Sequence, residues 1–203
     1  MAILLSAALG CAGTKQRVAR CPSMDTAPAV VTGPLSVRLD PLPQALEEPS
    51  GEDDQLIKSS LALANAVLMS DCFRIAFQQR KLTHTPAVEP EKLLLGLRGN
   101  LELRVVLFSG TYFQNHWSRT VGYDDPVDPT TVHTNTYFLR GPDRICVLAS
   151  NILHEVAHAR GFIHASPLES SSVPYSMNEI FDECVAQEVG AKEVTAPTEL
   201  VIE

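Results

Sequence analysis

The sequence predicts an α+β domain with a small mixed β-sheet, a backing helix, a helix that carries the candidate site and a C-terminal helix. Three observations predict this class. Apolar residues recur at spacings of three and four along residues 55–80, which is the helical pattern. Residues 101–108 are rich in β-branched side chains and begin with alternation, as strands do. A chain of 203 residues with 45% hydrophobic content is long enough to build one domain around its own core.

The first part of the chain, residues 12–54, is predicted to be a linker rich in Ala, Pro and acidic residues, with one short strand at Leu35–Leu39. The domain is expected over residues 55–192, followed by a tail over 193–203. It opens with one long helix, from Gln55 to Arg80.

Two strands and two helices follow in the expected domain. The strands are Leu101–Phe108 and Val132–Leu139, with irregular chain over residues 110–128 between them. The first of the two helices is Ile145–Arg160, and Gly161 stands where a glycine ends a helix. The last helix is expected to start at a capping box formed by Ser176 and Glu179, and to end near Lys192.

Composition excludes several functions. The chain carries 16 Lys and Arg against 24 Asp and Glu, a net charge of −8. This charge argues against a nucleic-acid partner, which needs a basic face for the phosphates. No apolar run reaches the ~18 residues that cross a membrane. Glycine-rich GxGxxG and GxxxxGK[ST] motifs are absent from the sequence, so these types of nucleotide chemistry have no support.

The N-terminal segment, residues 1–11, looks like a short export signal. Ala2–Leu9 is apolar, and Gly10 and Cys11 follow it as in a bacterial lipobox. This predicts an exported lipoprotein in the periplasm or at the cell surface, attached to the membrane through a lipidated Cys11. No basic residue precedes the apolar run, so a cytoplasmic chain with an apolar start is the alternative.

The chemistry of the chain is concentrated in HEVAHARGFIH, which runs from His154 to His164. Four residues of helix give about 400° of rotation and ~6 Å of rise, so His154 and His158 project from one face and can bind one Zn²⁺. Gly161 can adopt a positive φ, which turns the chain back and brings His164 to the same metal. Three nitrogen ligands leave a fourth position for water, as in catalytic zinc sites. Glu155 is then placed to act as general base on the zinc-bound water.

This stretch resembles the metzincin metallopeptidases, whose signature HExxHxxGxxH it matches at all five specified positions. The continuation SVPYSMN, residues 172–178, is similar to a group of uncharacterised bacterial zincin-like proteins. The resemblance implies a zincin-like fold, Zn²⁺ as cofactor and a peptide or protein as substrate.

The resemblance also suggests roles for two residues after the motif. Met177 lies 13 residues after His164, a plausible distance for the Met-turn beneath the metal of metzincins, although it also falls inside the expected capping box. Tyr175 corresponds in place to a Tyr that hydrogen-bonds the reaction intermediate in some metzincins, so it joins Glu155 as a candidate catalytic residue. Simple packing is the alternative for both.

A second zincin type offers a different third ligand. Gluzincins use a Glu on the helix after HExxH, and Glu183 shares a helix face with the small residues Ala186 and Gly190. The motif favours His164. Glu183 or Asp182 then remains a candidate to hold a ligand imidazole through its other nitrogen.

The remaining histidines are expected to lie outside the site: His84, His116 and His133. Of the three, His133 has the best prospect of reaching the site, because the strand Val132–Leu139 precedes the motif helix. In metzincins and gluzincins an antiparallel edge strand in this position binds extended substrate, and Tyr137 and Phe138 would flank its groove.

Four cysteines remain besides Cys11: Cys21, Cys72, Cys146 and Cys184. An even number is compatible with two disulfides in an oxidising compartment, and the pairing stays open. Cys21 lies upstream of the domain, and one hypothesis makes its thiol a latency ligand of the zinc.

The expected function is therefore that of a zinc metalloendopeptidase-like hydrolase, with Glu155 as general base. The rival from another class is a zinc-binding surface lipoprotein without turnover. An intact Glu155 favours catalysis, because a structural zinc site needs no general base.

Overall fold

The computed structural model describes residues 21–22, 33–37, 51–83, 85–86, 88–116, 121–124, 128–164 and 171–193. The expected export signal with Cys11, residue His84 and the tail beyond residue 193 lie outside this part of the chain.

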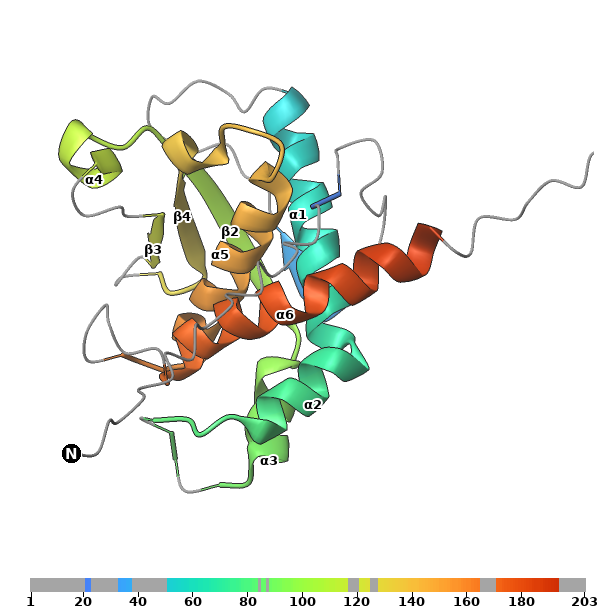
Figure 1. The fold of residues 1–203 in the computed structure, drawn as a ribbon. Coiled ribbons are helices and arrows are strands. Elements are labelled where there is room, and N and C mark those ends of the chain that lie inside the picture. Colours follow the sequence, from blue (N-terminus) through green and yellow to red (C-terminus); the bar gives the residue numbers. More distant parts are fainter. Residues whose placement is uncertain are drawn as a thin grey trace, which may run out of the picture.

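The described strands form one mixed sheet in the order β1-β2-β4-β3 (Figure 1). Strands β1 (Leu35–Val37), β2 (Leu101–Phe108) and β4 (Thr131–Asn135) run parallel, and β3 (Gly122–Asp124) pairs antiparallel with β4. This confirms the expected α+β class and the mixed sheet. Because β1 pairs with β2, the sheet includes a strand from the segment that the sequence assigned to the linker.

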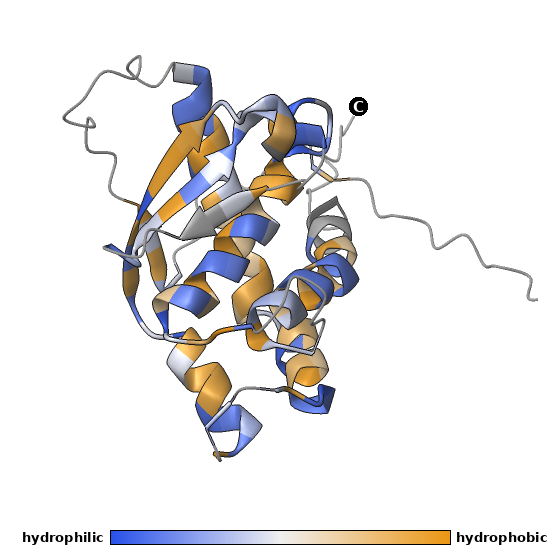
Figure 2. Cartoon of the chain, turned by 90° about the vertical axis from the view of Figure 1, so that its left-hand side faces the viewer, coloured by the Kyte–Doolittle hydropathy of each residue, from blue (hydrophilic) through white to orange (hydrophobic). Residues whose placement is uncertain are grey.

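The helices of the described chain are α1 (Gly51–Met69), α2 (Asp71–Gln79), α3 (Pro90–Leu97), α4 (Tyr112–His116), the 3₁₀ turn η1 (Thr136–Leu139), α5 (Arg144–Ala159) and α6 (Val173–Glu193). Helices α1 and α5 pack on each other and on the sheet, and α6 crosses both (Figure 1). Figure 2 shows hydrophobic and hydrophilic residues alternating from turn to turn along the helices. Their apolar sides meet in one core that buries Phe73, Phe77 and Phe181 completely.

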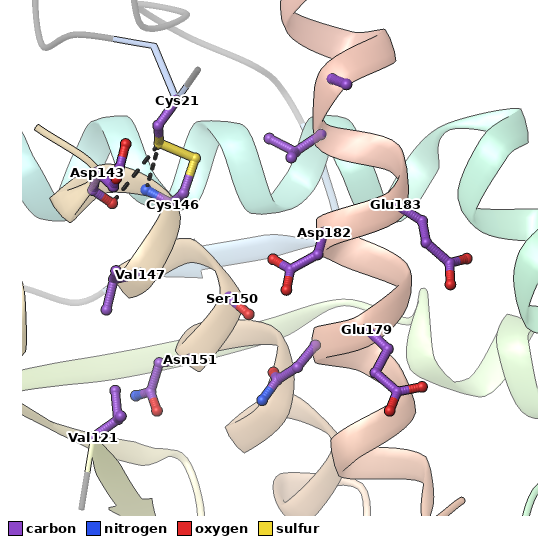
Figure 3. Close-up of a pocket in the computed structure, with 13 residues that line it drawn as sticks. Cys21, Val121, Asp143, Cys146, Val147, Ser150, Asn151, Glu179, Asp182 and Glu183 are labelled. Atoms are coloured by element: carbon purple, nitrogen blue, oxygen red, sulfur yellow. Dashed lines mark hydrogen bonds between the residues drawn. A yellow bond between two sulfur atoms is a disulfide. The ribbon is translucent and has the colours of Figure 1, made fainter. Parts of the chain in front are cut away.

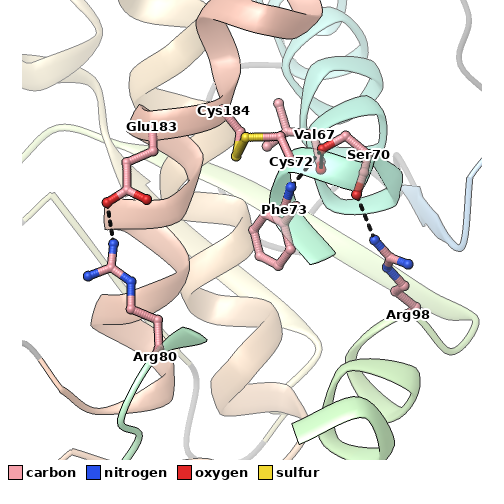
Figure 4. The surroundings of a disulfide bond; sticks show 8 residues. All are labelled: Val67, Ser70, Cys72, Phe73, Arg80, Arg98, Glu183 and Cys184. Carbon is pink, nitrogen blue, oxygen red and sulfur yellow. Dashed lines mark hydrogen bonds and ion pairs between the residues drawn. A yellow bond between two sulfur atoms is a disulfide. The ribbon is translucent and has the colours of Figure 1, made fainter. Parts of the chain in front are cut away.

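The expected single helix over residues 55–80 is wrong, because the chain breaks at Ser70 into α1 and α2, which meet at a bend of 61°. Ser70 is extended, and its Oγ accepts a hydrogen bond from the backbone N–H of Phe73 at 3.0 Å, which caps α2. Arg98 donates to the carbonyls of Leu68 and Ser70 at 2.9 and 3.0 Å, and so satisfies the end of α1. Figure 4 shows the bond to Ser70. Among the described helices none is by itself long and apolar enough to cross a membrane; α1 and α2 qualify only as a bent pair.

The expected strand Val132–Leu139 is wrong in its second half. Strand β4 ends at Asn135, whose side-chain oxygen accepts hydrogen bonds from the backbone N–H groups of Tyr137 and Gly110, both at 3.1 Å. These bonds turn the chain into η1, because an Asn side chain offers the backbone an alternative to the strand ladder. The region expected to be irregular, residues 110–128, contributes α4 and β3.

The expected capping box is also wrong. Helix α6 begins at Val173, and the backbone N–H of Ser176 already donates to the carbonyl of Ser172 at 2.9 Å. Pro174 fits the first turn because its missing N–H is not needed there. Glu179 instead pairs with Arg80 at 2.8 Å. Met177 lies fully buried within α6 and does not form a separate turn.

Two disulfides join distant parts of the chain. Cys72–Cys184 links α2 to α6 (Figure 4), and Cys21–Cys146 links the N-terminal segment to α5. The hypothesis that Cys21 is a latency ligand of zinc is wrong, because a disulfide sulfur offers no thiolate to a metal.

We expect loss of the Cys72–Cys184 bridge to reduce the free energy of unfolding by about 2–4 kcal/mol, since it closes a loop of 112 residues. Urea denaturation of the Cys72→Ser, Cys184→Ser double variant measures this. Reductant should lower the urea midpoint of the wild-type protein at least as much as the double substitution does. An unchanged midpoint in the variant would contradict the expectation.

Candidate metal centre

Helix α5 presents His154 and His158 on one side because its other side is committed to the core. Ile152, Leu153 and Val156 are fully buried, whereas both imidazoles are half-buried. The four-residue spacing puts the two rings on successive turns, with centroids 5.0 Å apart. Their Nε2 atoms face each other at 3.3 Å.

The end of α5 turns the chain back towards these imidazoles. Gly161 has φ +85°, its N–H donates to the carbonyl of His158, and the N–H of Phe162 donates to that of Ala157. This pair of bonds is a Schellman motif, which needs a residue with positive φ at the position of Gly161. The carbonyl of Phe162 then lies 2.9 Å from Nδ1 of His158. That contact fixes the ring and directs Nε2 towards the centre.

The turn brings His164 to the other two histidines. Its ring centroid lies 5.0 Å from that of His158 and 5.7 Å from that of His154. One nitrogen from each of the three rings falls within a group whose members are all within 4.8 Å of one another. No other group of this kind occurs in the part of the chain that the structure describes.

The environment of His154 keeps its imidazole neutral. Burial lowers its pKa from the ordinary 6.5 to about 3, and repulsion from His158 and His164 adds to the effect. Metal ligands must be deprotonated, so the neutral ring is the form that binds a metal. Its Nδ1 lies 3.3 Å from the side-chain amide of Asn178 on α6.

In the metal-free protein, we expect the free energy of unfolding to fall as the pH falls from about 6.5 towards 3. The unfolded chain takes up a proton on His154 near pH 6.5, whereas the folded chain does so near pH 3. Acid therefore favours the unfolded state, and stability rises with pH through this window. Urea unfolding in chelator at several pH values measures the slope. The His154→Asn variant should show a shallower slope, and equal slopes would contradict the assignment.

Two further residues complete the centre. Glu155 is 3% exposed and follows His154 directly on α5. Tyr175, in the first turn of α6, places its ring centroid 4.9 Å from that of His154 and 4.8 Å from that of His164. Partial burial, reinforced by the negative charge of Glu155, raises the pKa of the Tyr175 hydroxyl above 10.0. The hydroxyl thus stays protonated at neutral pH and can donate a hydrogen bond.

Other residues considered from the sequence lie elsewhere. Glu183 is half-exposed and binds Arg80, on the side of α6 shown in Figure 4. His116 stacks on Tyr112, and its Nε2 lies 3.4 Å from the hydroxyl of Tyr137. His133 lies on β4, an inner strand of the described sheet, so the expected edge strand is wrong. The antiparallel edge is β3.

The structure adds two residues that sequence reasoning did not select. Asn178 contacts His154, and no spacing rule marks it. Asn151 donates to Thr134 of β4 at 2.9 Å, and its amide approaches Gly122 so closely that a Cβ there would lie 2.5 Å away. Gly122, in β3, was the one available sequence signal, because a glycine in a strand often marks a place where another group approaches the backbone closely.

The distance between two of the three donor nitrogens is compatible with zinc. A tetrahedral Zn²⁺ with Zn–N bonds of ~2.0–2.1 Å separates its ligand nitrogens by roughly 3.3 Å. The Nε2 atoms of His154 and His158 are 3.3 Å apart.

Comparison of the chain with family models, with curated proteins and with solved structures finds no match.

Proposed function

We propose that this protein is a zinc-dependent peptidase of the zincin type, with His154, His158 and His164 as the zinc ligands. The observation that carries the proposal is the convergence of these three imidazoles beside the buried Glu155. When bound, zinc supplies Lewis-acid catalysis: it lowers the pKa of water and polarises a carbonyl group.

The chain's own residues supply the proton transfer. Glu155 accepts a proton from the attacking water and passes it to the departing amine, as a general base and then a general acid. Tyr175 carries a protonated hydroxyl beside the imidazoles, so we assign it a hydrogen bond to the reacting carbonyl oxygen.

The sheet supports a peptide as substrate. Among the described strands, in the order β1-β2-β4-β3, β3 pairs on one side only. An edge strand can add an extended peptide through backbone hydrogen bonds. Because β3 contacts α5, a peptide bound along it would run past the helix that carries His154. A zincin-like fold, with α1 as backing helix and α5 as active-site helix, fits this arrangement.

Metal analysis and proteolysis test the proposal. Protein purified at neutral pH with zinc supplied should hold about one zinc per chain. It should cleave quenched fluorogenic peptide pools, chelator should stop the cleavage, and added zinc should restore it. Protein that holds no zinc would overturn the proposal. Stoichiometric zinc without cleavage would instead favour a non-catalytic zinc-binding lipoprotein.

We also propose that the protein is exported and lipidated on Cys11. The motif after Ala2–Leu9 supports this, as do the disulfides Cys21–Cys146 and Cys72–Cys184, which persist in oxidising compartments. Cys11→Ser should move the protein from the membrane fraction to the soluble fraction, as fractionation and immunoblotting would show. A wild-type protein that is wholly soluble and retains Met1 would contradict this proposal.

A further inference from the structure

A groove of about 740 Å³ lies between α5 and α6 (Figure 3), and Asn178 in its wall contacts His154 of the candidate metal centre. On α5 its wall includes Val147, Ser150 and Asn151, which precede His154 by seven, four and three residues. These spacings place them on the same helix face as that ligand.

The residues of the α6 wall also have the spacing of one helix face. Asn178 and Asp182, which line the groove, follow Tyr175 by three and seven residues, so they share its helix face. The two faces that meet at the metal centre therefore also form the groove.

The groove combines apolar walls with acidic groups. The apolar part includes Val121 next to β3, together with Val147, Val185 and the Cys21–Cys146 disulfide. Its acidic residues are Asp143, Glu179, Asp182 and Glu183, and none of the described residues that line it is Lys, Arg or His.

Two of these carboxylates share one guanidinium group outside the groove. Arg80 pairs with both Glu179 and Glu183. In Figure 3 these two side chains extend to the side of α6 away from α5, whereas Asp182 extends towards Ser150 on α5. The groove thus keeps the carboxylate of Asp182, which has no hydrogen-bond or ion-pair partner among the described residues, and that of the exposed Asp143 at the start of α5. Partial burial, together with the charges of Glu179 and Glu183, raises the pKa of the Asp182 carboxyl group.

A second observation points to a ligand at the junction of the groove and the metal centre. One polar atom of the Asn178 amide lies 3.3 Å from Nδ1 of His154. The other, Oδ1, is buried and has no hydrogen-bond partner among the described residues. Whichever way the amide is turned, one polar atom of this wall residue is left without a partner.

We infer that this groove binds a lysine or arginine side chain next to the scissile bond of the substrate, and that Asp182 is the specificity-determining residue. Asp182 lies about one helical turn, ~6 Å, beyond Asn178. A long side chain with an apolar stem and a cationic head spans this distance, with the stem against the valines and the head at the carboxylate. The inference rests on the proposed peptidase function.

The test uses the zinc-loaded protein and four fluorogenic peptide pools that differ in one fixed residue: Lys, Arg, norleucine or Glu. Norleucine keeps the apolar stem of Lys and removes its charge. We expect kcat/KM for the Lys and Arg pools to exceed that for the norleucine pool by about tenfold, the effect of one charge-assisted hydrogen bond. Asp182→Asn should bring this ratio close to one. Glu188→Gln removes a charge from the same helix outside the groove and should leave the ratio unchanged.

A binding measurement separates failure of this inference from failure of the proposed function. Calorimetry with the zinc-loaded Glu155→Gln protein should show the same preference for Lys over norleucine without turnover. If zinc is bound but nothing is cleaved, the peptidase proposal fails, and this binding ratio still decides whether the groove is selective. Equal binding or cleavage of the Lys and norleucine pools would overturn the inference. So would an Asp182→Asn protein that melts like the wild type and keeps the preference.

Discussion

The Glu155→Gln variant should lose peptide cleavage by roughly 10²–10⁴-fold and keep its zinc, because the amide cannot accept a proton from water. Glutamine has nearly the same shape, and Glu155 is 3% exposed within α5, so the helix and its two imidazoles should stay in place. Steady-state cleavage of fluorogenic peptide pools, with zinc content measured on the same samples, checks both parts.

Two further measurements make this result specific. Glu188→Gln, a charge-matched change on α6 outside the groove, should retain wild-type activity. Circular dichroism should give the same melting temperature for Glu155→Gln and for the wild type. A Glu155→Gln protein with full activity would show that another group takes the proton, and would remove Glu155 from the mechanism.

The centre of the site could be predicted from the sequence because its signals are local. His154 and His158 are one helical turn apart, so a helix of any orientation puts them together. Gly161 signals its turn through the lack of a side chain, and its φ of +85° confirms the expected end of α5. His164 follows Gly161 by only three residues, so its approach to the other two histidines is also a local feature of the sequence.

The predictions that were wrong relied on a local sequence pattern that another hydrogen bond or ion pair overrides. The apolar spacing of residues 55–80 continues through Ser70, yet its hydroxyl caps α2 and breaks the helix. Ser176 and Glu179 have the spacing of a capping box, but Glu179 pairs with Arg80, 99 residues away in the sequence. Similarly, the alternation after Val132 ends where Asn135 binds the backbone of the following turn.

The surroundings of the site depend on contacts between distant residues, which a single sequence does not encode in its spacing. Asn178 meets His154 only because α6 packs on α5. The Cys21–Cys146 and Cys72–Cys184 pairs join residues 125 and 112 positions apart, and all three possible pairings of the four cysteines were equally compatible with the count. The groove that holds Asp182 exists for the same reason.

The identity of the third ligand gives the other large expected effect. His164→Ala should weaken zinc binding by roughly a thousandfold, because one of three similar ligand bonds is lost. Glu183→Ala should cost at most the ~10–100-fold expected for a residue that only supports a ligand. The contrast follows from their positions: His164 lies with the other imidazoles, whereas Glu183 is half-exposed and binds Arg80.

Competition with a chromogenic chelator measures the zinc affinity of His164→Ala and of Glu183→Ala on matched samples. Arg80→Ala is the useful companion variant, because it releases Glu183 without touching an imidazole, and it should leave zinc affinity close to that of the wild type. All three variants should unfold cooperatively in chelator, which separates loss of a ligand from loss of the fold. If His164→Ala keeps its zinc and activity while Glu183→Ala has neither, the third ligand is the Glu on α6. The site would then be of the gluzincin type, and Glu155 would keep the same role in it.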